Sequence, residues 1–524
     1  MKKLLTLLIT FILIATCLVG CADRTTPLAN VDGSVSGNGS FAVVKGDYLY
    51  FINGVGEVTA DNKFGEVEKS ALLRVKTADL ANLENANVET VIPKIILSSS
   101  YKTGFYMYGD YVYYATPCDD KNNKGEVKSS QTEFHRFNLK TGKTDSKEIA
   151  IAKDGATEYR FIENDNKVYL AFTTSETEND TTVKKLVVYE TESKDLVFTS
   201  EAYSEMLMAE DNSKYIYYTS KGVLKDLDDK QASFDELYRY EVGKDSSEVF
   251  LSGAGSTYVE SAEREELPKC QFFVENGFRG VTINLIKNTG KLVVLKVTSV
   301  DDTTVVSYYG FNTFDNIADL AKTEDNPLIK FKGGSTLLSA VLTSTAYFKA
   351  LNEIYYVNSE TTTEGVCVFN YEKAYENDLK NGVEIINKDA SAMSLIDLKE
   401  VDNVKYLYLA NTADGYYYQI NLSDKKLNKI NGLTYTTPTE WYAPVVVGKY
   451  FISSLKNETF GKYVYVKDMT DIGSEDYNEA LDALATLDRE KALDIMKTGI
   501  LNGTAKEEVQ AKVDELYPEE ESEE

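Results

Sequence analysis

The sequence predicts an all-β protein, a β-propeller, followed by a small helical appendage near its C-terminal end. Three observations carry this prediction: a tyrosine-rich strand motif repeats, further short strands follow each copy, and the composition changes after Met469. The first copy, residues 46–51, reads Gly-Asp-Tyr-Leu-Tyr-Phe, and residues 109–114 are a near copy. A polar turn followed by β-branched and aromatic residues is typical of a β-strand.

Both faces of the motif strand are apolar. Tyr48 and Tyr50 point to one side of the pleat, and Leu49 and Phe51 point to the other. Such a strand is expected to be buried on both sides, which requires sheets stacked on sheets. Looser or degenerate copies occur at residues 166–170, 214–218, 352–356, 405–409 and 448–452.

The spacing of the motif gives the number of repeated units. The markers, which are the second tyrosine of each copy or its equivalent, are Tyr50, Tyr113, Tyr169, Tyr217, Val294, Tyr355, Tyr408 and Ile452. Their mean spacing is about 57 residues, in the range of propeller blades that carry loop insertions. Eight markers predict eight blades, and the long gap before Val294 together with a weak last unit leaves seven open.

Each unit holds further short strands around the motif. One precedes it and others follow it, as at residues 72–75 and 237–240, with a polar turn and then a last strand such as 426–430. The last unit offers only residues 444–447, 450–454 and 462–466. The stretch before Phe41 is expected to supply its fourth strand, because an open ring would expose a sheet edge.

The strands resemble those of a known class of propellers. The tyrosine-rich motif strands, together with Leu-Tyr-Arg strands such as residues 237–239, resemble the six- to eight-bladed propellers of the TolB and YWTD-like families, common in bacterial lipoproteins. The resemblance covers about residues 38–470. No Tyr-Trp-Thr-Asp tetrapeptide occurs, so the partners of those families do not carry over, and the fold alone argues for no particular function.

The N-terminal residues predict a location outside the cytoplasm. Lys2 and Lys3 precede an apolar run, residues 4–15, that is typical of a signal peptide. Leu18-Val19-Gly20-Cys21 resembles the lipobox of bacterial lipoproteins. We therefore expect residues 1–20 to be cleaved and Cys21 to be lipidated. The lipid would hold the protein on the extracytoplasmic face of the cell membrane.

The predicted organisation follows from these segments. The signal peptide spans residues 1–20, a tether rich in Gly, Ser, Asp and Thr spans 21–37, and the propeller spans 38–470. A helical appendage is predicted at 471–518 and an acidic tail at 519–524. No run after the signal peptide is long and apolar enough to span a bilayer.

Charge and cysteine content exclude some classes of partner. The formal charge of −27 falls to −29 when Lys2 and Lys3 are cleaved off, which argues against nucleic acid and anionic lipid head groups as partners. Cys118, Cys270 and Cys367 are too few for a disulfide framework, and a Cys118–Cys270 pair stays open.

Three amphipathic segments follow the repeats. Ser474 and Asp488 are predicted to cap the first two helices, and Thr504 with Glu507 forms a capping box before the third, which Pro518 ends. The expected apolar faces are Tyr477, Leu481, Leu484 and Leu487; Ala492, Leu493, Ile495 and Met496; and Val509, Val513 and Leu516.

No residue pattern predicts catalysis. His135 is the only histidine, and it falls in mid-strand where the first unit has Leu73 and the fourth has Tyr238, which favours a structural role. Residues 453–456 match Ser-x-x-Lys and residues 497–499 match Lys-Thr-Gly. A correctly placed Ser-x-Asn element is absent, and the second match lies in a predicted helix instead of a strand, so these are interpreted as chance matches.

A metal or cofactor site is not predicted either. Asp226, Asp228 and Asp229 could touch Ca²⁺, but Leu237 stands where a calcium loop needs its bidentate glutamate. The pair Asp119 and Asp120 is interpreted in the same way, as a solvated loop. Neither a dinucleotide fingerprint nor a phosphate loop occurs.

Two classes of function remain. The favoured one is a non-catalytic scaffold that binds a protein, peptide or envelope glycan through its long polar insertions, residues 53–69 and 117–132. The alternative is a carbohydrate-active enzyme with paired carboxylates at the propeller axis. The sequence offers 83 acidic residues and no means of choosing two, and Trp441 is its only tryptophan.

Overall fold

The structure is a computed structural model that describes most of the chain between residues 41 and 518. The described ranges are 41–54, 70–97, 104–118, 131–153, 158–178, 181–202, 205–208, 214–222, 226–227, 230–231, 234–256, 278–285, 292–301, 304–313, 331–332, 347–350, 353–358, 364–370, 373, 382–411, 413–434, 444–455, 463–498 and 505–518.

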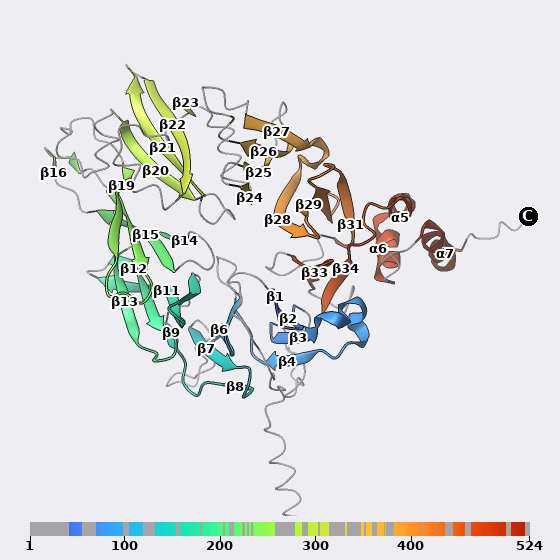
Figure 1. The fold of residues 1–524 in the computed structure, drawn as a ribbon, viewed down its shortest axis with the longest axis horizontal. Coiled ribbons are helices and arrows are strands. Elements are labelled where there is room, and N and C mark those ends of the chain that lie inside the picture. Colours follow the sequence, from blue (N-terminus) through green and yellow to red (C-terminus); the bar gives the residue numbers. More distant parts are fainter. Residues whose placement is uncertain are drawn as a thin grey trace, which may run out of the picture.

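Groups of antiparallel strands follow one another around a ring, and we call these groups blades 1–8 in chain order (Figure 1). The first four blades are β1 (Ala42–Lys45), β2 (Tyr48–Ile52), β3 (Leu72–Lys76) and β4 (Glu89–Ile92); β5 (Phe105–Tyr108), β6 (Tyr111–Pro117), β7 (Thr132–Asn138), β8 (Lys143–Thr144) and β9 (Ala150–Ala152); β10 (Tyr159–Asn164), β11 (Lys167–Glu178), β12 (Thr181–Glu190) and β13 (Leu196–Ala202); and β14 (Glu205–Met208), β15 (Tyr215–Gly222), β18 (Phe234–Glu241) and β19 (Glu248–Ser256). A side hairpin of β16 (Asp226–Leu227) and β17 (Lys230–Gln231) extends blade 4.

The other four blades complete the ring. They are β20 (Phe278–Leu285), β21 (Leu292–Asp301), β22 (Thr304–Thr313) and β23 (Phe331–Lys332); β24 (Tyr347–Ala350), β25 (Glu353–Asn358), β26 (Gly365–Asn370) and β27 (Val383–Asn387); β28 (Met393–Val401), β29 (Val404–Asn411), β30 (Tyr416–Asn421) and β31 (Leu427–Thr434); and β32 (Val445–Val447), β33 (Tyr450–Ser454) and β34 (Val464–Asp468). One residue pair, Gly255 with Thr282, joins blades 4 and 5. The predicted β-propeller is confirmed, with one blade for each of the eight markers in the described chain.

Each blade runs from the inside of the ring to the outside. Figure 1 shows β1, β14, β24 and β28 near the centre and β4, β13 and β27 at the periphery. Successive strands are antiparallel, so the turn between the second and third strand leaves every blade on the same side of the ring. We call this side the insertion rim, because both long insertions are connections of this kind.

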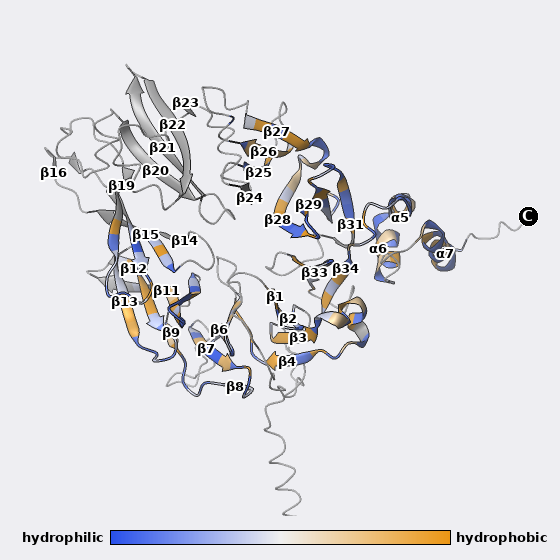
Figure 2. Ribbon diagram, in the orientation of Figure 1, coloured by the Kyte–Doolittle hydropathy of each residue, from blue (hydrophilic) through white to orange (hydrophobic). Residues whose placement is uncertain are grey.

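The hydrophobic core lies between neighbouring blades. One cluster combines Tyr50 of β2 with Phe105 and Tyr114 of blade 2, and another combines Phe134 of blade 2 with Phe161 of blade 3. Figure 2 shows apolar residues along the strands of these blades. Burial of both faces of the first motif strand is thus confirmed, because blade 1 packs against blade 2 on one side and blade 8 on the other.

The same arrangement of three residue types stabilises the outer part of blades 1, 2 and 4. An arginine of the third strand lies over a tyrosine ring of the second strand and pairs with a carboxylate at the fourth. We call this arrangement the aromatic clasp. Its members are Tyr48, Arg74 and Glu89 in blade 1; Tyr111, Arg136 and Asp145 in blade 2; and Tyr215, Arg239 and Glu248 in blade 4. The guanidinium carbon lies 4.8, 4.6 and 5.0 Å from the ring centroids, and the Nε–carboxylate distances are 2.6, 2.7 and 2.7 Å, respectively.

Blade 8 closes the ring by packing on blade 1. Ile452 of β33 and Val464 of β34 belong to the same apolar cluster as Tyr50, which we call the closure cluster. At the junction, a Cβ added to Gly54 would lie 2.1 Å from the carbonyl oxygen of Leu455. Only a residue without a side chain fits this approach, so the last blade meets the first without a gap.

The fourth position of blade 8 differs from the expectation. Beside β34 lies η2 (Thr77–Asn85), a 3₁₀ segment between β3 and β4 whose Leu80 joins the closure cluster. Blade 8 has three strands in the described part of the chain. The stretch before Phe41, which is predicted to supply a fourth, lies outside the described residues.

Three helices lie outside the ring next to blade 7 (Figure 1). They are α5 (Glu475–Ala485), α6 (Arg489–Lys497) and α7 (Lys506–Leu516). The caps predicted for α5 and α6 are confirmed, since Ser474 accepts a hydrogen bond from the Tyr477 amide at 3.3 Å and Asp488 accepts one from the Lys491 amide at 2.9 Å. Figure 2 shows α7 as largely hydrophilic. No helix in the described ranges is long and apolar enough to cross a membrane.

The predicted start of α7 is wrong. The N-cap residue is Ala505, which has no side-chain acceptor, and the helix begins one residue later than a cap at Thr504 requires. Glu507 is then the second helical residue and cannot make the reciprocal bond of a capping box. Leu516, which was expected on the buried face, is 39% exposed because α7 packs chiefly through the fully buried Val509.

Candidate functional site

The stems of the two predicted binding insertions rise from adjacent blades on the insertion rim. The β2–β3 connection begins with Asn53, which is buried and exchanges backbone hydrogen bonds with Ser70 and Ala71 at 2.6 and 2.9 Å. The β6–β7 connection is paired by the Cys118 amide, which donates to the Gln131 carbonyl at 3.0 Å. The ends of both insertions are therefore fixed by the sheets. Residues 55–69 and 119–130 lie outside the described residues.

His135 is buried in the strand that follows the second insertion in the sequence. It lies in mid-strand in β7, in the same register as Leu73 and Tyr238 of blades 1 and 4. Its Nε2 lies 2.9 Å from Oε2 of Glu133, and its ring stacks on Tyr114 with 5.7 Å between centroids. With both side chains about nine-tenths buried, this pair can hold the hairpin together but has little access to a substrate.

Glu133 connects His135 to a cysteine. Burial favours the neutral carboxyl, but hydrogen bonds from His135 and Cys118 outweigh it and leave the pKa of Glu133 below its usual value. Cys118 and Cys367 are buried as reduced thiols, and burial raises the pKa of Cys367 to about 11. In the described ranges, no three or more His, Cys, Asp or Glu side chains are grouped so that they could hold a metal ion.

The two motif matches lie far from a catalytic arrangement. Ser453 and Ser454 are fully buried in β33, at the junction between blades 8 and 1. Lys497 is the last residue of α6, and Thr498 is its C-cap. Asp226 lies in β16. The remaining positions singled out in the sequence lie outside the described residues: Cys21, Asp119, Asp120, Asp228, Asp229, Cys270, Trp441, Lys456 and Gly499.

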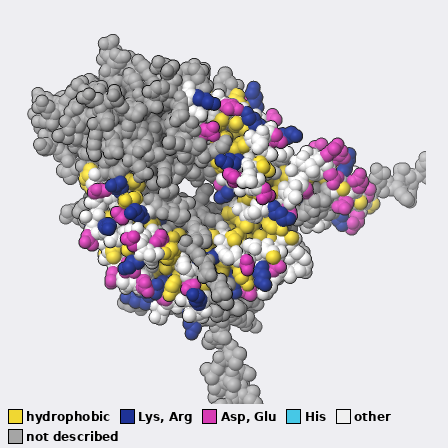
Figure 3. Space-filling view, viewed as in Figure 1, with side chains coloured by type: hydrophobic (Ala, Val, Ile, Leu, Met, Phe, Trp, Pro, Cys, Tyr) yellow, Lys and Arg dark blue, Asp and Glu magenta, His cyan; other side chains and the backbone are white. Residues whose placement is uncertain are grey.

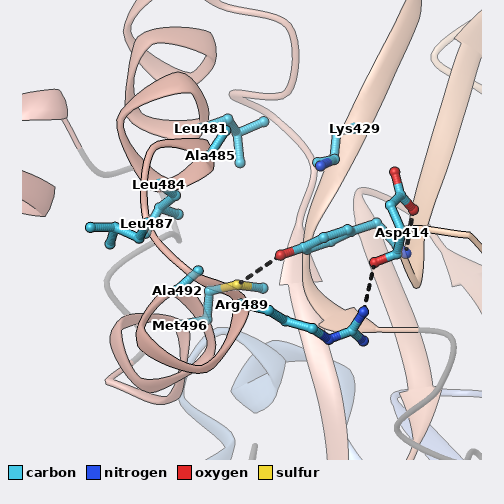
Figure 4. Close-up of a pocket in the computed structure, with 10 residues that line it drawn as sticks. Asp414, Lys429, Leu481, Leu484, Ala485, Leu487, Arg489, Ala492 and Met496 are labelled. Atoms are coloured by element: carbon cyan, nitrogen blue, oxygen red, sulfur yellow. Dashed lines mark hydrogen bonds between the residues drawn. The ribbon is translucent and has the colours of Figure 1, made fainter.

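A pocket of about 210 Å³ lies where blade 7 meets the helical appendage (Figure 4). We call it the seam pocket. Blade 7 contributes the turn before β30, the first residue of β30 and one residue of β31, and the remaining walls come from α5, α6 and the link between them. The lining residues are Asp414, Tyr416, Lys429, Leu481, Leu484, Ala485, Leu487, Arg489, Ala492 and Met496.

One end of the seam pocket is polar. The Asp414 carboxylate accepts hydrogen bonds from the Tyr416 amide at 2.9 Å and from the Tyr418 hydroxyl. Nη1 of Arg489 donates to the Asp414 main-chain oxygen at 3.3 Å. The amine of Lys429 lies 3.9 Å from the centroid of the Tyr416 ring. Figure 4 shows Lys429 and Arg489 on opposite sides of that ring.

Burial shifts the pKa values of the titratable side chains at this end of the pocket. It lowers the pKa of Lys429, an effect that the nearby Asp414 carboxylate opposes. Burial also raises the pKa of Tyr416 and Tyr418, so both phenols stay neutral at physiological pH. The lining charges are thus two cations and one carboxylate, a positive balance on a protein whose sequence carries −27.

The other end of the seam pocket is apolar. Leu484, Ala492 and Met496 belong to the buried core of the appendage, and the Tyr416 hydroxyl contacts the Met496 sulfur at 3.7 Å. Tyr477 docks α5 on the blade, because its hydroxyl donates to the main-chain oxygen of Lys429 at 3.0 Å. The same residue type that forms the repeat strands therefore also attaches the helices.

The seam pocket was not predicted from the sequence. The apolar positions of α5 and α6 were expected to pack on one another or on a blade, but the sequence does not say which blade. One signal was available: the turn Asp414-Gly415 opens a strand with Tyr416 and Tyr418 on one face, and Lys429 pairs directly with Tyr418 in the next strand.

Comparison with known proteins found similarity to solved structures only. Neither a protein-family model nor a curated protein matches the chain. Among solved structures, the β-propeller domain of the trilobed protease from Pyrococcus furiosus is similar, with 12% identity and a TM-score of 0.35 over 75% of this chain and 96% of that one. Oligopeptidase B from Trypanosoma brucei is also similar, with 12% identity and a TM-score of 0.36 over 70% of this chain and 46% of that one.

A third similar structure is Sqt1 from Chaetomium thermophilum, bound to the N-terminus of ribosomal protein L10. It shares 8% identity and a TM-score of 0.31 over 80% of this chain and 93% of that one. The chain thus spans under half of oligopeptidase B but nearly all of the other two. At these identities and TM-scores, the likeness carries no conclusion about the function of this chain.

Proposed function

We propose that the protein is an extracytoplasmic lipoprotein whose propeller is a non-catalytic binding scaffold for a protein, peptide or envelope glycan. The observation that carries this proposal is the position of the two long polar insertions. They are the same connection in two adjacent blades, so their ends emerge side by side on the insertion rim. Rigid sheets that present neighbouring loops are a common way to build a binding surface.

The composition of the insertions suits recognition of a polar partner. Residues 55–69 and 119–130 contain both acidic and basic side chains with several glycines and asparagines. Figure 3 likewise shows acidic and basic side chains interspersed over the described surface facing the viewer. Such a surface favours selective hydrogen bonding over capture of one charge sign.

Anchoring is proposed to occur through the lipid on Cys21. Residues 21–37 would then connect the membrane to the ring, and a fully extended chain of this length reaches about 55–60 Å. That reach lets the propeller scan a zone above the membrane instead of lying on it. Cys21→Ser should release the protein from membranes or leave it uncleaved, and attachment of labelled lipid to that variant would refute the anchor.

The rim is tested by capture from an envelope extract. Full-length protein is compared with a variant in which residues 55–69 and 119–130 are both replaced by Asn-Gly turns. Capture should be lost in this variant while its thermal unfolding transition stays close to wild type. The matched control replaces residues 456–462, the equivalent connection of blade 8, and should capture as wild type does. If capture survives the double replacement, the rim insertions are not the binding surface.

A further inference from the structure

The seam pocket contains a cation that differs from those of the aromatic clasps. Arg74, Arg136 and Arg239 each touch a carboxylate. Lys429 lies over an aromatic ring in the same way, but among the described residues its amine forms no ion pair. Its charge is partly buried against Tyr416, and the carboxylate that lines the same pocket, Asp414, is already bonded by Tyr418 and the Tyr416 amide.

A half-buried cation that forms no ion pair with a described residue attracts an anion. Charge-assisted hydrogen bonds between an ammonium or guanidinium group and a carboxylate are about twice as strong as neutral ones. Arg489 also lines the pocket, but it lies on the other side of the Tyr416 ring, where it donates to the Asp414 main chain. The Lys429 ammonium group therefore suits one carboxylate group of a ligand.

The opposite end selects an apolar group. Leu481, Leu484, Ala492 and Met496 line it, and Leu484 and Met496 are almost completely buried. The volume of about 210 Å³ is below the roughly 300–1,000 Å³ of sites for drug-sized ligands. The space suits a ligand part no larger than one amino-acid residue.

We propose that the seam pocket binds a terminal carboxylate that has an apolar side chain beside it, such as the C-terminal leucine of a peptide. Lys429 holds the carboxylate, and the apolar wall of α5 and α6 takes the side chain. A free acylated amino acid offers the same chemistry as a peptide C-terminus. The inference does not depend on the insertion rim, because replacing both insertions leaves every residue of this pocket in place.

The test is a calorimetric titration of the full-length protein in detergent. Three probes are compared: acetyl-Ala-Ala-Leu with a free carboxylate, the same peptide as its C-terminal amide, and N-acetyl-leucine. We expect the free carboxylate to bind roughly ten- to hundredfold more tightly than the amide, the effect of losing a hydrogen bond to a charged group. If the tripeptide binds more tightly than N-acetyl-leucine, the ligand is a peptide end; equal binding indicates the free acid.

Two variants make the result specific. Lys429→Met keeps the length of the side chain and removes its charge, and should weaken carboxylate binding by roughly tenfold or more. Lys426→Met is the matched control, because Lys426 is an exposed lysine just before the same strand and lies outside the pocket. It should bind as wild type does. No binding of either carboxylate probe, binding of the amide as tight as that of the acid, or equal losses in the two variants would each overturn the proposal.

Discussion

Blades 1, 2 and 4 and blade 7 each combine a tyrosine, a cation and a carboxylate, but they arrange these groups differently. In the clasps, the tyrosine is on the second strand, the arginine is on the third, and the acid is at the fourth. In blade 7 the set is shifted one strand outward, with Tyr416 on the third strand and Lys429 on the fourth.

The shift changes what the cation can do. An arginine between an aromatic ring and a carboxylate in the same sheet is neutralised locally, so its effect is on the stability of the blade. Lys429 lies in the edge strand of its sheet and forms no ion pair with a described residue, so its charge stays available. The difference indicates that clasp residues are structural and that the seam pocket is the place to look for a ligand.

The largest expected effect comes from blade 1, which combines a clasp with the closure of the ring. Removing residues 28–45 deletes β1 and the buried Phe41, Ala42 and Val43 of the closure cluster. Because blade 8 packs on this cluster, we expect the whole ring to unfold rather than one end to loosen. Loss of the cooperative transition in calorimetry would show this, whereas a wild-type transition would disprove closure through blade 1.

A single clasp should have the next largest effect. Arg74 is 3% exposed, and Arg74→Met leaves Glu89 without its cation. The free energy of unfolding should fall by about 2–4 kcal/mol, somewhat less than for a fully buried pair because Glu89 retains some access to water. Urea unfolding measures it, with Lys429→Met expected to change stability by less than about 0.5 kcal/mol. An equal loss of unfolding free energy in the two variants would contradict the distinction between the structural clasp arginine and the available lysine of the seam pocket.

Removal of the helical appendage should abolish the seam pocket and leave the aromatic clasps intact. A chain ending at residue 473 keeps all the clasps and loses α5 and α6, which form one wall of the seam pocket. We expect a modest loss of stability, an unchanged β-sheet signal in circular dichroism, and no binding of the leucine-terminated probe. Global unfolding of the truncated chain would instead make the helices part of the propeller core.

The smallest effect is a pH dependence specific to Lys429. Its pKa in the folded state is lowered from the usual 10.5, chiefly by burial, so the unfolded chain binds more protons in the window just below that value. Stability of the wild type should therefore rise relative to Lys429→Met as pH increases through the folded pKa toward 10.5. Thermal melts of both proteins across this window measure the difference, and a constant difference would contradict the burial of the charge.

The sequence predicted the repeating part well because local residue patterns specify it. The motif around Tyr48 and Tyr50 marks the second strand in most blades, and the register that places His135 level with Leu73 follows from aligning the third strands. Caps at Ser474 and Asp488 were also predictable, since a cap depends on residues within one turn. The predicted cap of α7 was wrong by one residue, because the N-cap is Ala505 and not Thr504. An error of one residue is usual for a helix end.

The seam pocket could not be predicted, because it depends on where the appendage docks. Residues of β30, β31, α5 and α6 form its walls, and their proximity is decided by Tyr477, whose hydroxyl reaches the main chain of Lys429. Nothing in the local pattern of α5 distinguishes a tyrosine that docks on blade 7 from one that packs between helices. Likewise, η2 beside β34 follows from the packing of Leu80 into the closure cluster.

The apparent pKa of the Lys429 amine, measured with and without peptide, tests most directly whether this lysine binds a ligand while the clasp arginines are structural. Reductive methylation with ¹³C labels the lysine amines and keeps their charge, and Lys429→Met identifies the signal. On titration with acetyl-Ala-Ala-Leu, the account predicts a shift of the Lys429 signal and a rise in its apparent pKa, since a bound carboxylate favours the ammonium form. The signal of Lys426 should not move. An unchanged Lys429 signal at a peptide concentration that saturates the protein would contradict the account.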